Sequence, residues 1–133
     1  LQEAGMSYQP ELVVWFHTED RKVKPAVMVQ MMLEAELPID AVVCYNDQIA
    51  VEVIRMLERI GKKVPEDISV AGFDGTEMAA YYNPAITTIR QPAEIMAKET
   101  IKLLFDSIKK KTKVQQLIFE GELVPGESVK KRK

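Results

Sequence analysis

Residues 40–60 read Asp-Ala-Val-Val-Cys-Tyr-Asn-Asp-Gln-Ile-Ala-Val-Glu-Val-Ile-Arg-Met-Leu-Glu-Arg-Ile, and this stretch decides the fold class. Its first six residues form a short apolar run that is typical of a buried strand. Asn46 and Asp47 then suit the start of a helix, and Gly61 suits its end. Apolar side chains recur between them at helical spacing. The predicted buried face consists of Ile49, Val53, Ile54, Leu57 and Ile60.

The same alternation of strand and helix extends in both directions along the chain. Further strands are predicted at residues 11–16, 68–73 and 87–90, with a last extended segment at 114–124. Further helices are predicted at 25–35, at about 76–80 and from Pro92 to about 110. The strands are apolar throughout, as they are in parallel sheets that are buried on both faces. We therefore predict an open, parallel α/β sheet with helices on both faces.

Composition and charge restrict the classes of function. With 133 residues and 47% hydrophobic side chains, the chain supports one core rather than two full domains. The net charge of -2 combines +5 in residues 108–133 with -7 in the rest, so an acidic body disfavours binding to nucleic acid by this chain alone. We expect the basic runs at 109–113 and 130–133 to be a solvated helix end and a tail. No apolar run approaches the roughly 20 residues of a membrane span.

Polar side chains follow three of the predicted strands, at residues 17–20, 46–48 and 74–76. Ligands of open α/β sheets bind beyond the carboxyl ends of the strands. Carboxylates and amides side by side exchange hydrogen bonds with neighbouring hydroxyls, which suits a sugar or another small polyol. The alternative is that Asn46, Asp47 and Asp74 only cap helices.

Signatures of catalysis are scarce. The sequence has no Gly-x-Gly-x-x-Gly, Walker A or Gly-x-Ser-x-Gly motif. Its one histidine, His17, and one cysteine, Cys44, cannot supply a usual zinc site, and we expect no metal and no cofactor. His17 could equally be a loop residue without a role, and Cys44 an inert buried thiol. An enzyme that uses Asp47 and Asp74 as paired carboxylates is the weaker alternative.

Three stretches resemble the effector-binding domain of the lactose/galactose repressor (LacI/GalR) family of bacterial transcription regulators. They are Ala41-Val-Val-Cys-Tyr-Asn-Asp-Gln-Ile-Ala50, Val64-Pro-Glu-Asp-Ile-Ser-Val-Ala-Gly-Phe-Asp74 and Pro84-Ala-Ile-Thr-Thr-Ile-Arg-Gln91. Residues 121–128 also fit the last strand of that family. The resemblance implies a periplasmic-binding-protein-like fold of type I, with a small sugar-like effector between two α/β subdomains. Arabinose-type repressors also fit the sequence.

The resemblance also implies how the chain is divided. Residues 1–90 would belong to the C-terminal subdomain, 91–119 would be a segment of the N-terminal subdomain, and 120–133 would be the return strand and a basic tail. The chain has no initiator methionine, and its first five residues look like the end of a helix. We therefore expect it to be part of a longer protein that carries the helix-turn-helix. We expect the helix at 92–110, without the rest of that subdomain, to dock elsewhere, exchange between chains or be disordered.

Effector-binding residues carry over from the family by position. Asn46 and Asp74 match ligands of sugar hydroxyls, and Gln91 matches a residue that lines the cleft. His17 and Asp20 lie in a loop where family members place another ligand contact. Two positions depart from the family: Gly75 stands where a second aspartate is usual, and Ala93 stands where an aromatic is usual.

The resemblance further implies a cytoplasmic homodimer that contacts DNA only through the helix-turn-helix region and has no contact with a membrane. The predicted dimer contact consists of Val51, Tyr81, Tyr82 and Pro84. The two tyrosines could instead cover the local core. The implied function is a sugar-responsive repressor. The alternative is a periplasmic solute-binding protein of a sugar transporter, which shares the fold.

Overall fold

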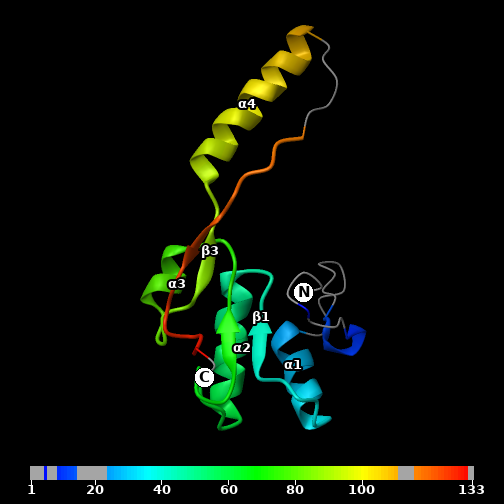
Figure 1. The fold of residues 1–133 in the computed structure, drawn as a ribbon, viewed down its shortest axis with the longest axis vertical. Coiled ribbons are helices and arrows are strands. Elements are labelled where there is room, and N and C mark those ends of the chain that lie inside the picture. The colour runs from blue at the N-terminus through cyan, green and yellow to red at the C-terminus, as the bar shows by residue number, and fades with distance from the viewer. Residues whose placement is uncertain (1–4, 6–8, 15–23, 111–115, 132–133) are drawn as a thin grey trace.

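A computed structural model describes residues 5, 9–14, 24–110 and 116–131 of the chain. A body of short strands and three helices carries one long helix, which projects away from it (Figure 1). The strands are β1 (Ala41–Val43), β2 (Ser69–Ala71), β3 (Thr88–Arg90) and β4 (Glu122–Val124). The helices are α1 (Pro25–Glu34), α2 (Asp47–Arg59), α3 (Glu77–Tyr81) and α4 (Ala93–Lys110). None of these helices, within the ranges described, is both long and apolar enough to cross a membrane.

The strands form a mixed sheet with a parallel half. β1 pairs with β2 in parallel, Val42 lying opposite Val70, and β3 pairs with β4 antiparallel, Ile89 lying opposite Leu123. The two pairs are linked because the Gly72 N–H donates to the Thr87 carbonyl oxygen at 2.9 Å. The predicted parallel α/β sheet is confirmed, and β4 adds an antiparallel strand at its edge.

The core lies between the sheet and the helices α1 and α2. α2 buries Val53, Ile54 and Leu57 as predicted, together with Ala50 and Met56, whereas Ile60 is exposed beyond its last turn. Gly61, at φ +78°, ends the helix in the left-handed conformation that glycine favours.

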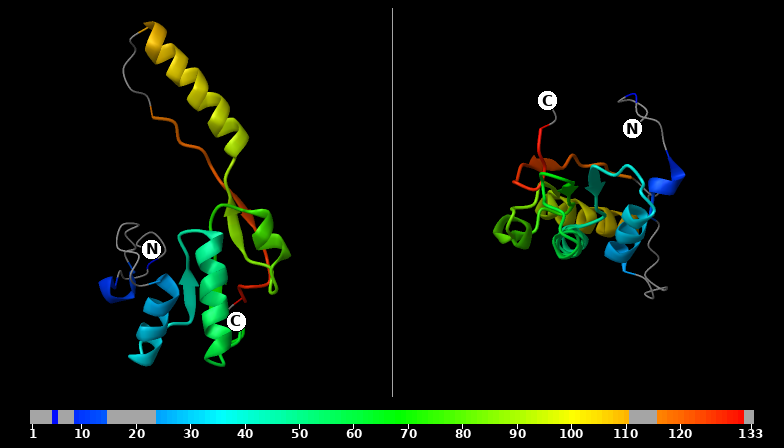
Figure 2. Two further views of the ribbon diagram at one scale, coloured as in Figure 1. Left: turned by 180° about the vertical axis from the view of Figure 1, so that it is seen from behind. Right: turned by 90° about the horizontal axis from the view of Figure 1, so that it is seen from below.

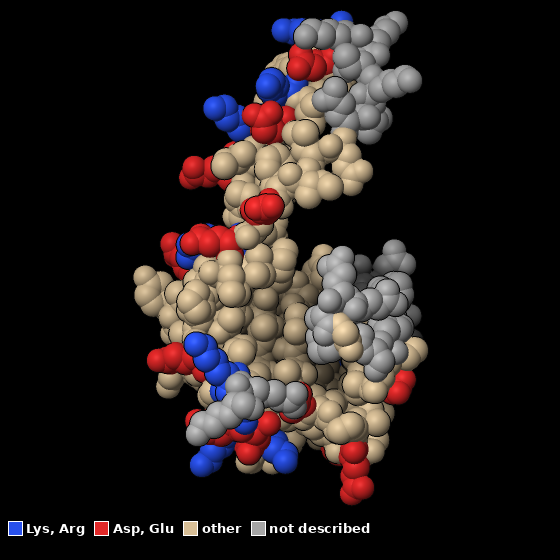
Figure 3. Space-filling model, in the orientation of Figure 1, with Lys and Arg blue, Asp and Glu red and all other residues tan. Residues whose placement is uncertain are grey.

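The helices of the body lie on one side of the strands (Figure 2). Val42 and Cys44 of the β1 segment face this side and join the core. Val43 and Tyr45 point the other way and are 84% and 85% exposed. The middle of this second face shows few charged side chains (Figure 3). The predicted helices on the second face are therefore not supplied by the part of the chain that the structure describes.

The predicted strand at residues 11–16 is wrong in its described part. Pro10–Leu12 form a 3₁₀ helix, and Val13 and Val14 follow it outside any strand. The Leu12 and Val13 N–H groups donate to Gln9 and Pro10 carbonyl oxygens, so they are not available to a neighbouring strand. The β-branched run was a misleading signal because Pro10 favours a turn ahead of it.

The segment after β4 closes the body. The Ser128 carbonyl oxygen accepts the Val70 N–H at 2.8 Å, and the Ser128 hydroxyl donates to the Val70 carbonyl oxygen at 2.6 Å. The same hydroxyl accepts the Thr87 N–H at 2.9 Å. Ser128 is fully buried. One side chain therefore ties the end of the chain to β2 and to the start of β3.

α4 confirms the predicted helix at 92–110 but not its predicted fate. Figures 1 and 2 show it extending away from the body. Its apolar stripe is exposed, and the stripe consists of Ile95, Ile101, Leu104, Phe105 and Ile108. Neither disorder nor docking on another described part of this chain is seen. Exchange between chains stays a prediction.

Candidate functional site

The turn after β1 places Asn46 at the start of α2. The Asn46 Oδ1 accepts the Ile49 N–H at 2.9 Å, so this residue is a helix cap, as the alternative interpretation held. The Nδ2 group of the same side chain donates to no residue in the ranges that the structure describes. The cap therefore uses the Oδ1 atom of the amide, and the Nδ2 group is available to a ligand.

The turn after β2 holds Asp74 in an unusual conformation. Its φ is +110°, in a region that residues other than glycine rarely adopt. Thr76, not Asp74, is the N-cap of α3, so the capping alternative for Asp74 is wrong. The Asp74 Oδ1 instead accepts the Gln91 Nε2–H at 2.6 Å. The structure thus brings together two of the predicted effector-binding residues.

The two turns are neighbours at the same edge of the sheet. The Asp47 N–H donates to the Phe73 carbonyl oxygen at 2.9 Å, which joins the residue after Asn46 to the residue before Asp74. At this edge the Asn46 amide donor, the second carboxylate oxygen of Asp74 and the amide oxygen of Gln91 make no hydrogen bond to another described residue. One donor beside two acceptors is an arrangement that recognises a polyol.

Asp47 is the residue whose role the sequence did not reveal. It is 1% exposed, and its carboxylate accepts three hydrogen bonds from Thr76 and Thr88. The sequence suggested only a helix cap or one of two catalytic carboxylates. No signal in the sequence identifies this role, because the partners Thr76 and Thr88 lie 29 and 41 positions from Asp47.

Gly75 fits its position for a backbone reason. Its φ is +68°, and a Cβ at this position would lie 2.5 Å from the Arg90 Cα. A larger residue would need both a strained backbone and a shifted strand. The close approach of this turn to β3 therefore explains why this chain has glycine where the family usually has an aspartate.

The remaining predicted site residues differ in how far they are described. His17 and Asp20 lie outside the described residues. Ala93 is exposed at the first position of α4.

The four predicted dimer residues differ in exposure. Tyr81 is 86% exposed and Pro84 is half-buried. Tyr82 and Val51 both pack against the core, so the core-covering alternative holds for Tyr82. Tyr81 is thus the most exposed part of the predicted contact.

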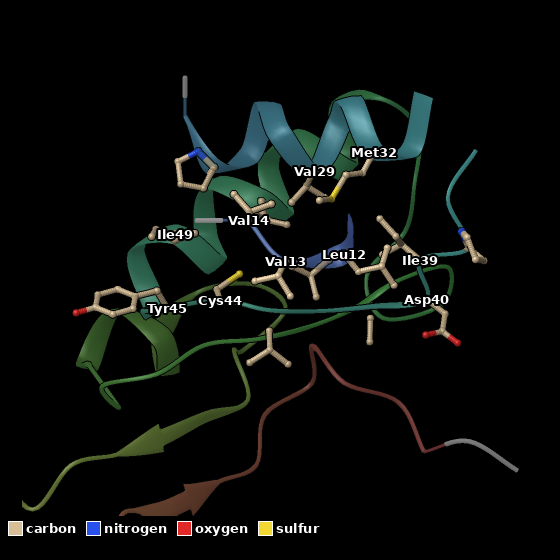
Figure 4. A pocket seen from close by; sticks show the side chains of 16 residues that line it. Leu12, Val13, Val14, Val29, Met32, Ile39, Asp40, Cys44, Tyr45 and Ile49 are labelled. Carbon is tan, nitrogen blue, oxygen red and sulfur yellow. The ribbon is translucent and has the colours of Figure 1, made fainter. Parts of the chain in front are cut away.

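A pocket of about 360 Å³ lies between residues 12–14, α1 and β1 (Figure 4). Among the described residues that line it, the side chains are apolar apart from Asp40 and the hydroxyl of Tyr45. It therefore lacks the paired amides and carboxylate found at the two turns. Cys44 is buried beside it, and burial raises the pKa of this thiol to about 12. The prediction that Cys44 is a buried thiol is confirmed.

Comparison with known proteins places this arrangement in a family. The model of the periplasmic binding protein-like domain matches residues 2–129. The repressor PurR of Aliivibrio salmonicida (strain LFI1238) is 36% identical over 134 residues, which cover 98% of this chain and 39% of that protein. PurR of Vibrio vulnificus (strain CMCP6) is 41% identical over 93 residues, which cover 68% of this chain and 28% of that protein. The chain thus spans well under half the length of these relatives.

Solved structures agree with the sequence relatives. A complex of the transcriptional regulator CelR with cellobiose superposes with a TM-score of 0.81 at 31% identity, over 96% of this chain and 38% of that one. The lac repressor dimer bound to operator and the anti-inducer ONPF gives 0.70 at 26% identity, over 77% of this chain and 36% of that one. The chain therefore belongs to the periplasmic binding protein-like domain family, in the form found in the effector-binding domains of LacI/GalR-type transcription regulators.

Proposed function

We propose that this chain is part of the effector-binding module of a cytoplasmic, sugar-responsive transcriptional repressor. The observation that carries the proposal is the hydrogen bond between Gln91 and Asp74, beside the Asn46 turn. It gathers a carboxylate and two amides at the edge of the sheet where ligands of open α/β folds bind.

The division of the chain into subdomains is part of this proposal. Residues 1–90, whose described part forms most of the body, would be the C-terminal subdomain. Residues 91–119, which include α4, would belong to the N-terminal subdomain, and 120–133 would return to the body. The projection of α4 away from the body supports this division (Figure 1). The exposed stripe of α4 would then pack within the second subdomain.

The effector would lie between the subdomains, with the Asn46 and Asp74 turns as one wall. Asn46 would donate to a ligand hydroxyl, and Asp74 and Gln91 would accept from others. His17 and Asp20 are proposed as further contacts. A sugar is favoured by this chemistry and by the cellobiose bound in the similar CelR structure.

Regulation would follow from a shift between open and closed arrangements of the two subdomains. An effector that binds the closed arrangement more tightly raises its population by the difference in binding free energy. Coupling to DNA affinity then requires DNA-binding heads elsewhere in the protein. A homodimer formed through Tyr81, with Tyr82, Pro84 and Val51 beside it, would link two such modules.

A solute-binding protein of a transporter is the second candidate, since the matching family model is described by its likeness to periplasmic binding proteins. The relatives named above favour the repressor. The reading frame upstream of Leu1 distinguishes the two, because a helix-turn-helix supports the repressor and a signal peptide supports the transporter protein.

Calorimetry on the protein expressed from its complete reading frame tests the effector. The panel consists of cellobiose, galactose, arabinose and ribose, with nucleobases as cyclic polar compounds that lack hydroxyls. We expect micromolar binding of a sugar, weakened at least tenfold by Asp74→Asn. Asp67→Asn is the matched control, because Asp67 is an exposed aspartate whose carboxylate accepts the Lys63 N–H at 2.8 Å, away from the two turns. Binding of nucleobases alone, or equal effects of the two variants, would contradict a sugar site at Asp74.

A further inference from the structure

Asp47 is a buried carboxylate that the proposed contacts with the effector do not use. It occupies the first position of α2 and is 1% exposed. Its Oδ2 accepts the Thr76 N–H at 2.7 Å and the Thr76 hydroxyl at 2.9 Å. Its Oδ1 accepts the Thr88 hydroxyl at 2.6 Å. The carboxylate thus connects α2, the turn after β2 and the strand β3.

Thr88 extends this network to the backbone of the turn. Its Oγ1 accepts the Gly75 N–H at 3.2 Å while it donates to Asp47. The N–H groups of both residues that follow Asp74 are therefore bound, directly or through one hydroxyl, to the same carboxylate. Asp74 itself makes no hydrogen bond to Asp47 among the contacts that the structure describes.

The conformation of Asp74 needs such support. At φ +110° its backbone is strained. Backbone strain of this kind persists only where the surrounding structure holds it. Before the turn, the Asp74 N–H donates to the Ile89 carbonyl oxygen at 3.0 Å. After it, the Asp47 network fixes Gly75 and Thr76. The turn is therefore held on both sides.

The space around Asp47 is equally restricted. A Cβ at Gly72 would lie 2.3 Å from the Asp47 Oδ1, so only glycine fits against this carboxylate. The absence of a side chain at Gly72 therefore provides the space that the Asp47 carboxylate occupies beside the end of β2. The carboxylate is thus held by its three hydrogen bonds in a space that only glycine at position 72 leaves open.

We propose that Asp47 is a positioning residue for the effector site. Through Thr76 and Thr88 it holds the Asp74 turn in the conformation that directs the Asp74 carboxylate and its partner Gln91 toward the effector. Asp47 itself touches no effector. This inference rests on the proposed function for the meaning of the site, but the geometry of the turn can be tested without any ligand.

The test compares four variants of the protein expressed from its complete reading frame. Asp47→Asn replaces an acceptor oxygen of the carboxylate with an amide donor, and Thr88→Val removes the bridging hydroxyl. Thr88→Ser keeps that hydroxyl and is the conservative rescue. Thr87→Val is the matched control, since Thr87 is the neighbouring residue and its hydroxyl accepts the Gly126 N–H at 3.0 Å, outside this network.

Hydrogen–deuterium exchange of the peptide that spans residues 73–77 is the first measurement, with no ligand present. We expect Thr88→Val and Asp47→Asn to exchange at least tenfold faster there, while Thr88→Ser and Thr87→Val stay near the wild type. If Thr88→Val leaves this peptide unchanged, or Thr87→Val accelerates it equally, the inference is wrong. Thr88→Val decides the case should Asp47→Asn fail to fold.

Calorimetry with cellobiose is the second measurement. We expect affinity to fall at least tenfold in Thr88→Val and to stay within twofold in Thr88→Ser and Thr87→Val. Faster exchange without weaker binding would show that the turn does not position the site, and would overturn the inference. If the wild type binds neither cellobiose nor another sugar of the panel, the sugar proposal fails, and the exchange result alone decides whether Asp47 holds the turn.

Discussion

The buried hydroxyl of Ser128 stabilises the body through two hydrogen bonds. It donates to the Val70 carbonyl oxygen and accepts the Thr87 N–H. We expect Ser128→Ala to lower the free energy of unfolding by about 2 kcal/mol, because it removes two hydrogen bonds and leaves the buried Val70 carbonyl oxygen without the hydroxyl donor. Denaturant unfolding measures the change. Ser107→Ala, on the exposed surface of α4, is the control and should change stability little. Equal effects of the two would contradict the role of Ser128.

The burial of Cys44 predicts that its thiol reacts slowly in the folded protein. Its pKa is raised from 9.0 to about 12 by burial, so the thiolate fraction at pH 8 falls roughly a thousandfold. We expect a disulfide reagent such as Ellman's to label Cys44 slowly at pH 8, and rapidly once guanidinium unfolds the chain. Rapid labelling of the folded protein would show that the thiol is accessible.

The same shift links stability to pH. The folded chain keeps the Cys44 proton to a higher pH than the unfolded chain does, so the contribution of this group is complete below about pH 9 and is lost as pH rises toward 12. Cys44→Ala should weaken this loss in denaturant unfolding followed between pH 8 and 11. An unchanged pH dependence in the variant would contradict it.

The candidate site was only partly predictable at the scale of residues. Asn46 and Asp74 could be found because each follows a strand. Gln91 was assigned from the family resemblance. The burial of Asp47 could not be foreseen, since its partners Thr76 and Thr88 lie 29 and 41 positions away. Sequence spacing carries no record of such contacts, which depend on how β2 and β3 align.

At the scale of elements, α2 holds the core together. Its fully buried side chains include Ile54 and Leu57. We expect Leu57→Ala to destabilise the chain by about 3 kcal/mol, because it removes apolar contacts and leaves a cavity. Ile60→Ala, at the exposed C-cap of the same helix, should cost much less. The denaturant midpoints of the two variants measure these changes. A larger loss of stability in Ile60→Ala than in Leu57→Ala would contradict the burial of Leu57 in the core.

Elements with a strong period or a clear start signal were predicted best. α1 begins at Pro25 and α4 directly after Pro92, where proline suits the first turn. The residues at 11–14 were mistaken for a strand because a short apolar run does not itself distinguish a strand from other buried segments. Of the predicted extended segment at 114–124, the structure describes residues 116–124, and within these only Glu122–Val124 form a strand, because they pair with β3.

At the scale of the whole molecule, α4 leaves a large apolar surface exposed. Phe105 and Ile108 lie on this surface, and Ile108 is 67% exposed. We expect residues 1–133, expressed alone, to self-associate in sedimentation experiments, because exposed apolar patches of this kind mark association sites. Leu104→Asn combined with Ile108→Asn should weaken that association at least tenfold. Lys98→Asn with Lys102→Asn is the control on the same helix, and an equal effect of the two pairs would contradict an apolar contact.

The bonds between Val70 and Ser128 also bear on how the body is made during protein synthesis. The two residues are 58 positions apart, so β2 leaves the ribosome long before the segment that completes its hydrogen bonds. At typical rates of about 5–20 residues per second, this delay lasts roughly 3–12 s. For that time the Val70 edge of β2 is an unpaired strand edge in a growing chain, open to pairing with another polypeptide. Translation speed between these two codons should therefore influence how much of the protein reaches its folded state.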